Sequence, residues 1–146
     1  MTSTLRRTTA VAASVLLAVG VGLASAATIH LRLTGSQEVP SVKTMARGSG
    51  VVDVASNGKV SGRITTRGIQ GTMAHIHEAA PGKNGPPILA LKRGAKGTWV
   101  VPAGSKLSAR EYKAFLAGDL YVNVHSAAHP GGEIRGQLRP EGKHRR

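Results

Sequence analysis

Two histidines at positions i and i+2 are the residues whose type and spacing best suit chemistry. His75 and His77 flank Ile76 in the stretch "TMAHIHE". Side chains alternate along a strand, so both imidazoles point to one face, with Cα atoms roughly 6.6 Å apart, and Ile76 points to the core. Two imidazoles in this arrangement can bind one transition-metal ion at about 2.0 Å. Such short motifs also match by chance, so the pair alone leaves two readings open: a metal clamp or two inert surface histidines.

A second stretch, "YVNVHSAAHPGGEIRG", supplies a third imidazole. Alternation places Val122 and Val124 in the core and His125 on the opposite face. If this strand lies near the first one, His75, His77 and His125 meet on one outward surface. The sequence therefore predicts a three-nitrogen metal site on the outside of a sheet.

Three further residues are candidate adjuncts to this site. Met73 lies on the same face as His75, and a thioether beside imidazoles favours copper, although methionine is more often a packing residue. His129, in the turn, is a candidate fourth ligand or lid. Glu133 is a candidate acceptor that holds an imidazole N–H in place. The alternative for Glu133 is a surface ion pair with Arg135.

The remaining pattern predicts short strands that position these residues. In "TIHLRLTG", Ile29, Leu31 and Leu33 alternate with polar residues, as in a half-buried strand. Asn57-Gly58 between two β-rich runs predicts a hairpin with a type I′ turn. "DLYVNVHS" and "EIRGQLRP" are predicted to form a closing hairpin. Seven or eight such strands favour an all-β fold, an immunoglobulin-like or Greek-key antiparallel β-sandwich.

One short helix is predicted at residues 109–117, within "KLSAREYKAFLAGD". Ser108 and Glu111 fit a capping box, and Gly118 fits the position that ends a helix. Tyr112, Phe115 and Leu116 form an apolar stripe. We expect this stripe to plug one edge or end of the strand assembly.

Composition limits the classes of function. The 146-residue chain has no cysteine, so it forms no disulfide, and a metal site must use His, Met or carboxylates. Its net charge of +13 attracts anions such as phosphate polymers, anionic lipids or acidic glycans. With one Trp, two Tyr and one Phe, stacking platforms for bases are scarce, and no nucleic-acid partner is expected.

The N-terminal stretch has the features of a secretory signal peptide over residues 1–26. Arg6 and Arg7 precede an apolar run over 10–23, and Ala24-Ser25-Ala26 is a small-x-small cleavage site. An uncleaved anchor is the alternative. We expect an exported protein that is either secreted or retained in the periplasm or cell envelope, without a transmembrane span in its mature form. Residues 27–140 would form the domain, and 141–146 a basic disordered tail.

Three stretches resemble the CHRD domain, the chordin-type repeat that is also found singly in exported bacterial proteins. They are "LTGSQEVPSVKTMARGSGVVDV", "GIQGTMAHIHEAAPGKNGPPILAL" and "LSAREYKAFLAGDLYVNVHSAAHPGGEIRGQL". The resemblance covers nearly all of residues 27–140. It implies an immunoglobulin-like or Greek-key β-fold and implies little about activity.

A more distant resemblance is to copper-zinc superoxide dismutase. "AHIHEAAPGKNGPP" is similar to that family's histidine-x-histidine strand and following loop, and "VNVHS" is similar to its late copper-ligand strand. The resemblance implies that His75, His77 and His125 occupy copper-ligand positions. The chain departs from that family because no histidine lies between Ala79 and Tyr121 to bridge two metals, and because cysteine is absent.

These observations support three hypotheses. The first is an exported protein that binds a transition metal, copper being favoured, as a carrier, buffer or resistance factor. The second is a non-catalytic module that binds an anionic envelope polymer or a protein partner. The third is a copper-only enzyme similar to superoxide dismutase. No catalytic residue is proposed, and nothing in the sequence indicates an oligomeric state.

Overall fold

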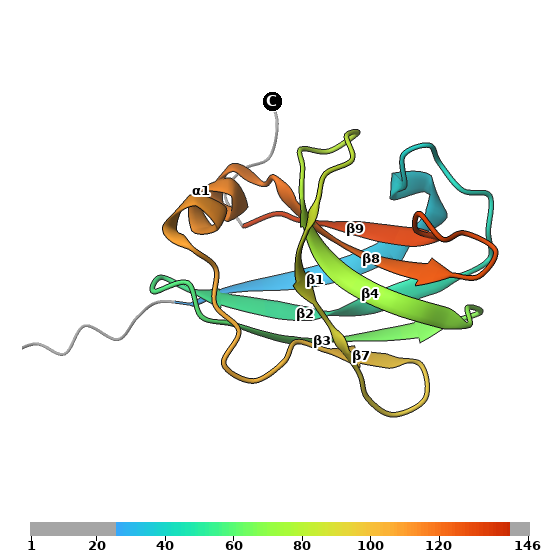
Figure 1. The fold of residues 1–146 in the computed structure, drawn as a ribbon, viewed down its shortest axis with the longest axis horizontal. Helices are drawn as coiled ribbons and strands as arrows, with labels where there is room; N and C mark the ends of the chain where they lie inside the picture. The colour runs from blue at the N-terminus through green and yellow to red at the C-terminus, as the bar shows by residue number, and fades with distance from the viewer. Residues whose placement is uncertain (1–25, 141–146) are drawn as a thin grey trace, which may run out of the picture.

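The computed structural model describes residues 26–140 and shows an all-β protein with one short helix (Figure 1). The strands are β1 (Ala26–Thr34), β2 (Arg47–Ala55), β3 (Val60–Arg67), β4 (Gly71–Glu78), β5 (Pro87–Ala90), β6 (Lys92–Arg93), β7 (Thr98–Val100), β8 (Leu120–Ser126) and β9 (Ile134–Leu138). A 3-10 turn, η1 (Gly35–Gln37), follows β1, and α1 (Ala109–Ala117) precedes β8. The predicted all-β class and the predicted helix at 109–117 are both confirmed.

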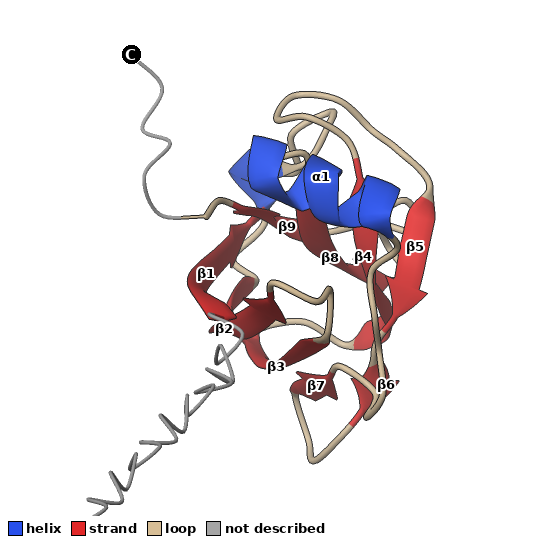
Figure 2. Ribbon diagram, turned by 90° about the vertical axis from the view of Figure 1, so that its left-hand side faces the viewer, coloured by secondary structure: helices blue, strands red, loops and turns tan. Residues whose placement is uncertain are grey.

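All the strands belong to one antiparallel sheet in the order β5-β4-β8-β9-β1-β2-β3-β7-β6. β5 and β6 end this order on opposite sides, yet only Leu91 separates them in the chain. The two edges must therefore approach each other, and the sheet curls into a flattened, nearly closed barrel (Figure 2). One half consists of β5, β4, β8 and β9, and the other of β1, β2, β3, β7 and β6.

The core lies between the two halves. Ile29, Leu31 and Leu33 of β1 are at most 4% exposed. The inward positions of the closing hairpin, Val122, Val124, Ile134 and Leu138, are all fully buried. The period-2 alternation thus predicted the core face of both segments correctly.

The hairpin between β2 and β3 differs from its prediction. A type I′ turn needs positive φ at both central residues. Gly58 has φ +85°, but no residue other than glycine has positive φ within residues 26–140, so Asn57 does not take that conformation. The Asn57 side chain instead accepts a hydrogen bond from the Lys59 N–H at 3.0 Å. This local bond favours a longer loop in which Gly58 alone is left-handed.

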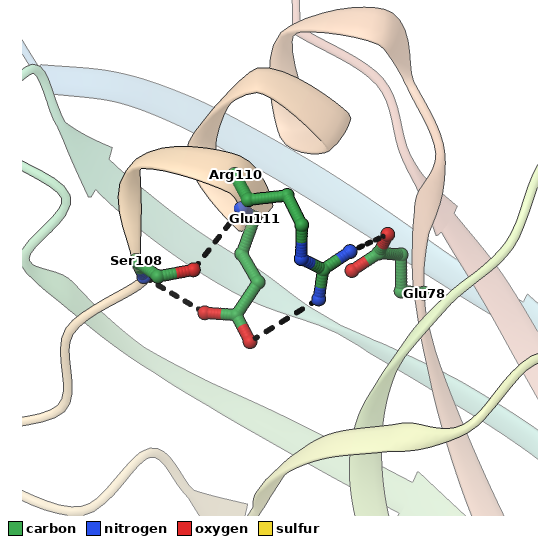
Figure 3. A network of polar contacts seen from close by, with 4 residues as sticks. All are labelled: Glu78, Ser108, Arg110 and Glu111. Atoms are coloured by element: carbon green, nitrogen blue, oxygen red, sulfur yellow. Dashed lines mark hydrogen bonds and ion pairs between the residues drawn. The ribbon is translucent and has the colours of Figure 1, made fainter.

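Helix α1 begins and ends where its sequence signals predict. Ser108 and Glu111 form the reciprocal capping box, and Gly118 adopts φ +81° at the C-terminus. Arg110, in the first turn, pairs with Glu78 at the end of β4 (Figure 3). Phe115 is fully buried against the core. The helix is therefore anchored across one end of the barrel, next to the strand that carries the histidine pair.

The predicted signal peptide lies outside the described residues except for Ala26, which begins β1. The predicted tail at 141–146 also lies outside them. Within residues 26–140, no helix has the length and apolarity that a bilayer crossing requires.

Candidate metal centre

The histidine pair lies on the outer face of β4, and the third histidine lies on its neighbour β8. Ala74 and Ile76 of β4 point into the core and are each 1% exposed, so His75 and His77 point the other way. β4 and β8 pair antiparallel, with His75 opposite Asn123 and His77 opposite Tyr121. His125 is two residues beyond Asn123 along β8. The predicted proximity of the two segments is therefore confirmed by direct strand pairing.

The three rings meet closely enough to bind one ion. One ring nitrogen from each of His75, His77 and His125 lies within 4.8 Å of the other two. His75 Nδ1 and His125 Nε2 are 3.1 Å apart. Two nitrogens bonded at about 2.0 Å to a tetrahedral ion lie about 3.3 Å apart, and at most about 4 Å in any geometry. The first pair already has this spacing, and a pair near the 4.8 Å limit has to close by roughly 1 Å.

Two of the rings are held with a lone pair directed at the cluster. His77 Nδ1 donates to the Gly85 carbonyl at 2.9 Å, and His125 Nδ1 donates to the Pro130 carbonyl at 2.8 Å. A carbonyl only accepts, so in each neutral ring Nδ1 carries the proton and Nε2 keeps its lone pair. His77 Nε2 is buried and has no hydrogen-bond partner among the described residues. Its ring is therefore oriented as a ligand before any ion arrives.

The third ring, that of His75, forms a hydrogen bond with His125 that a bound ion would replace. Because His125 Nδ1 donates to Pro130, His125 Nε2 must be the acceptor in its 3.1 Å contact with His75. The proton of this contact therefore belongs to His75 Nδ1. To ligate through the same nitrogen, His75 has to move that proton to Nε2.

Burial and the repulsion of neighbouring charges favour the neutral forms of His75 and His77, and the neutral imidazole is the form that binds metals. Burial lowers the pKa of His75, and the neighbouring rings of His125 and His77 lower it further. Burial also lowers the pKa of His77, against the opposing effect of its hydrogen bond to Gly85. Protons therefore compete less for these nitrogens than they would for exposed imidazoles.

The cluster is not on the open surface, contrary to the prediction. His77 is 8% exposed and His125 is 6% exposed. Two segments cover this face of β8 and β9: residues 35–46 after β1, and residues 79–86 after β4, which rise on the same side in Figure 1. Asn84 donates to the Val39 carbonyl at 2.6 Å and so joins the two segments. Strand alternation identifies the face away from the core, but it does not reveal that loops bury that face.

A buried arginine holds the second of these segments over the cluster. Arg135 of β9 was expected on the surface, but it is 1% exposed. Its guanidinium carbon lies 3.4 Å from the centre of the Tyr121 ring, and Tyr121 stacks in turn on His77. The same guanidinium donates to the carbonyls of Lys83 and Ala80. Arg135 thus supports the His77 ring indirectly, through Tyr121, and its hydrogen bonds hold residues 79–86 in place.

Sequence reasoning missed a buried polar pair beside the cluster. Glu38 is 6% exposed and Asn123 is 2% exposed, and each has one buried oxygen without a hydrogen-bond partner among the described residues. Burial raises the pKa of Glu38 to about 7, although Arg135 and Asn123 oppose this effect. Asn123 could be assigned to this face by alternation, but Glu38 lies in an irregular segment with no periodic signal.

Of the three adjuncts, His129 and Glu133 lie outside the three-histidine group. Met73 is opposite His125 in the register and is 47% exposed. The His129 backbone N–H donates to the Ser126 hydroxyl. Glu133 accepts from the hydroxyls of Thr44, at 2.6 Å, and Ser126, at 2.5 Å.

The role expected of Glu133 belongs to other groups. The imidazole N–H groups of His77 and His125 are held by the carbonyls of Gly85 and Pro130. Burial tends to raise the pKa of Glu133, but its two hydroxyl donors and the nearby His129 together hold it below its usual value. Glu133 is therefore an ionised acceptor that joins β9 to Thr44 rather than a partner of the imidazoles.

The chain matches the family model described as the CHRD domain over residues 29–138. No curated protein matches it. No solved structure matches it either, so the resemblance to copper-zinc superoxide dismutase stays a prediction.

Proposed function

Because this chain belongs to the CHRD domain family and its domain brings three imidazoles together, we propose that it binds one transition-metal ion through His75, His77 and His125. The observation that carries the proposal is the buried, unpartnered Nε2 of His77 beside a nitrogen pair 3.1 Å apart. An unpartnered buried polar atom costs about 1–3 kcal/mol. A bound ion would remove this cost.

Copper is the ion that the donor set favours. The three donors are imidazole nitrogens. Because the chain has no cysteine, it has no thiolate ligand that would favour a different metal. Among divalent first-row ions, nitrogen sites bind Cu²⁺ most tightly. The carbonyls of Gly85 and Pro130 fix two rings in the ligating tautomer, which raises the affinity of the site.

The cellular role that fits this site is that of an exported copper carrier, buffer or resistance factor. The support for export is the signal-peptide pattern of residues 1–26. The support for binding over catalysis is the burial of His77 and His125 beneath residues 79–86, which restricts access of a substrate to the ion.

The test is a titration of the purified protein with Cu(II), followed by electron paramagnetic resonance and calorimetry. We expect one ion per chain and hyperfine structure from nitrogen ligands. His77→Gln should weaken binding at least about 100-fold, since outer-shell changes alone cost 10–100-fold.

Matched controls are His30→Gln and His129→Gln, which remove imidazoles outside the cluster and should leave the affinity unchanged. Absence of a nitrogen-ligated signal would contradict the proposal. So would an unchanged signal in a variant with all three cluster histidines replaced by alanine. A parallel titration with Zn(II) that gives the tighter complex would replace copper with zinc.

A further inference from the structure

The outer face of β1, β2 and β3 carries arginines in successive rows of the sheet. The register places Thr34, Arg47 and Arg67 in one row, Arg32, Ser49 and Thr65 in the next, and His30, Val51 and Arg63 in the third. Arg32, Arg63 and Arg67 are exposed, and the positions that alternate with this outer face, such as Leu31, Leu33 and Ile64, point to the core. Four guanidinium groups therefore lie on one face within three rows.

These charges have no acidic partners. Within residues 26–140, the side-chain ion pairs involve only Arg110, so none of these arginines is neutralised by a carboxylate. Asp53 is the one acidic residue on the outer face of the three strands, and its carboxylate accepts from Thr28 in a fourth row. Arg47 and Arg67 are opposite each other in the register, an arrangement of like charges that destabilises a sheet, and the Arg47 guanidinium also donates to the carbonyls of Thr44 and Ala46. A bound anion would reverse this repulsion.

We propose that this arginine face binds a linear phosphodiester polymer that has no bases. The cations on the face are arginines, and a guanidinium contacts a phosphate through two parallel hydrogen bonds. Hydroxyls of Thr34, Ser49 and Thr65 lie between them as further donors.

The extent of the face favours a polymer over a small anion. Rows two residues apart are about 6.6 Å apart, so three rows span about 13 Å, too far for one phosphate to contact all of them. Two surface grooves cross this region. Arg32 lines both, together with Arg47 and Arg67 in one groove and Arg139 in the other.

The absence of stacking side chains distinguishes the partner from a nucleic acid. The outward positions of β1, β2 and β3 include no Phe, Tyr or Trp. Proteins that bind single-stranded nucleic acids usually stack bases on such rings. This face belongs to the half of the sheet that lacks the histidine cluster, so its binding is independent of the proposed metal site.

The experiment measures binding of the full chain to poly(glycerol phosphate) at several salt concentrations. The variant carries Arg32→Gln, Arg63→Gln and Arg67→Gln. The matched control carries Lys92→Gln, Lys96→Gln and Lys113→Gln, which remove the same charge from other exposed positions. We expect the arginine variant to bind about tenfold or more weakly and the lysine variant to bind nearly as well as the parent. The slope of log K against log salt concentration should also become shallower by about 2 in the arginine variant. Each of the three lost phosphate contacts contributes about 0.7 to this slope.

Each of the following outcomes would overturn the proposal. Equal losses in the two triple variants would show attraction to net charge without a defined face. Equal binding of polyglutamate would exclude selectivity for phosphate, and tighter binding of oligo(dT) would indicate a nucleic acid. If glycerol 3-phosphate binds as tightly as the polymer, binding does not require contacts with several rows of the arginine face. A chelator should change none of these affinities, which separates this test from that of the metal site.

Discussion

Glu38 combines deep burial with a carboxyl group that ionises only near neutral pH. Its pKa is raised from 4.5 to about 7, chiefly by burial. The Gly132 Cα approaches so closely that an added Cβ would lie 2.6 Å from Glu38 Oε1 and 2.5 Å from Asn123 Nδ2. Only glycine therefore fits at 132, and the two polar side chains are packed against the turn that leads into β9.

Glu38→Gln should change the pH dependence of stability. The folded state holds the Glu38 proton more tightly than the unfolded state, so stability falls as pH rises from 4.5 to about 7, and the full loss is present above 7. The gap corresponds to about 3 kcal/mol. Relative to the parent, the variant should therefore be more stable at pH 8.5 than at pH 4 by up to that amount, measured by urea unfolding.

Glu111→Gln is a control of opposite sign, because its hydrogen bonds with Ser108 hold the pKa of Glu111 below the usual value. Relative to the parent, that variant should lose stability as pH rises. A stability difference between parent and Glu38→Gln that does not vary with pH would contradict the account of Glu38.

At the scale of elements, the loop between β4 and β5 completes the histidine cluster. It supplies the carbonyl of Gly85 to His77, and Arg135 secures it from β9 through the carbonyls of Lys83 and Ala80. The backbone of Gly85 lies so close to that of Glu78 that a Cβ at 85 would overlap the Glu78 carbonyl oxygen. The loop can therefore reach the imidazole only with glycine at this position.

Gly85→Ala should weaken metal binding although it removes no ligand. The backbone must shift to accommodate the methyl group, and the carbonyl that orients His77 shifts with it. We expect a loss of affinity of about tenfold, as for other changes to groups that orient metal ligands. Gly131→Ala is the matched control, because a Cβ there meets nothing within 4 Å. Equal affinities of the two variants, measured by calorimetry, would contradict this role of the loop.

At the scale of the whole molecule, closure of the sheet leaves an end that the helix covers. The chain passes from the β5 edge to the β6 edge through Leu91, whose N–H donates to the Ala74 carbonyl at 2.9 Å. Phe115 of α1 contributes the largest fully buried apolar side chain. Helix α1 is thus part of the core and not an appendage to the barrel.

Phe115→Ala should destabilise the fold by about 3–5 kcal/mol, since it deletes a buried ring and leaves a cavity. Leu116→Ala, at a position 43% exposed, should cost well under half of that and serves as the control. Denaturant unfolding monitored by far-ultraviolet circular dichroism gives both values. A small loss for Phe115→Ala would mean that the helix end of the barrel can collapse around the deletion.

Local patterns predicted most of the elements and only part of the site. Alternation in β1, β8 and β9 identified the core face because one residue in two must avoid water. The capping box placed α1 because its hydrogen bonds join residues three apart. The turn at Asn57 was predicted wrongly, since the side-chain bond to Lys59 favours a different backbone conformation. The loops over the histidines were missed because their contacts join residues about 50 positions apart, such as Arg135 with Lys83.

The sequence by itself determined that His75 and His77 share one face, that Val122 and Val124 are buried, and that the helix runs over 109–117. These properties depend on neighbours within a few residues. Only the tertiary structure decided that His125 lies 3.1 Å from His75, that Glu38 is buried, and that the arginines of β1, β2 and β3 form one face. These properties depend on strand order and register, which the closed sheet sets through contacts between residues far apart in the chain.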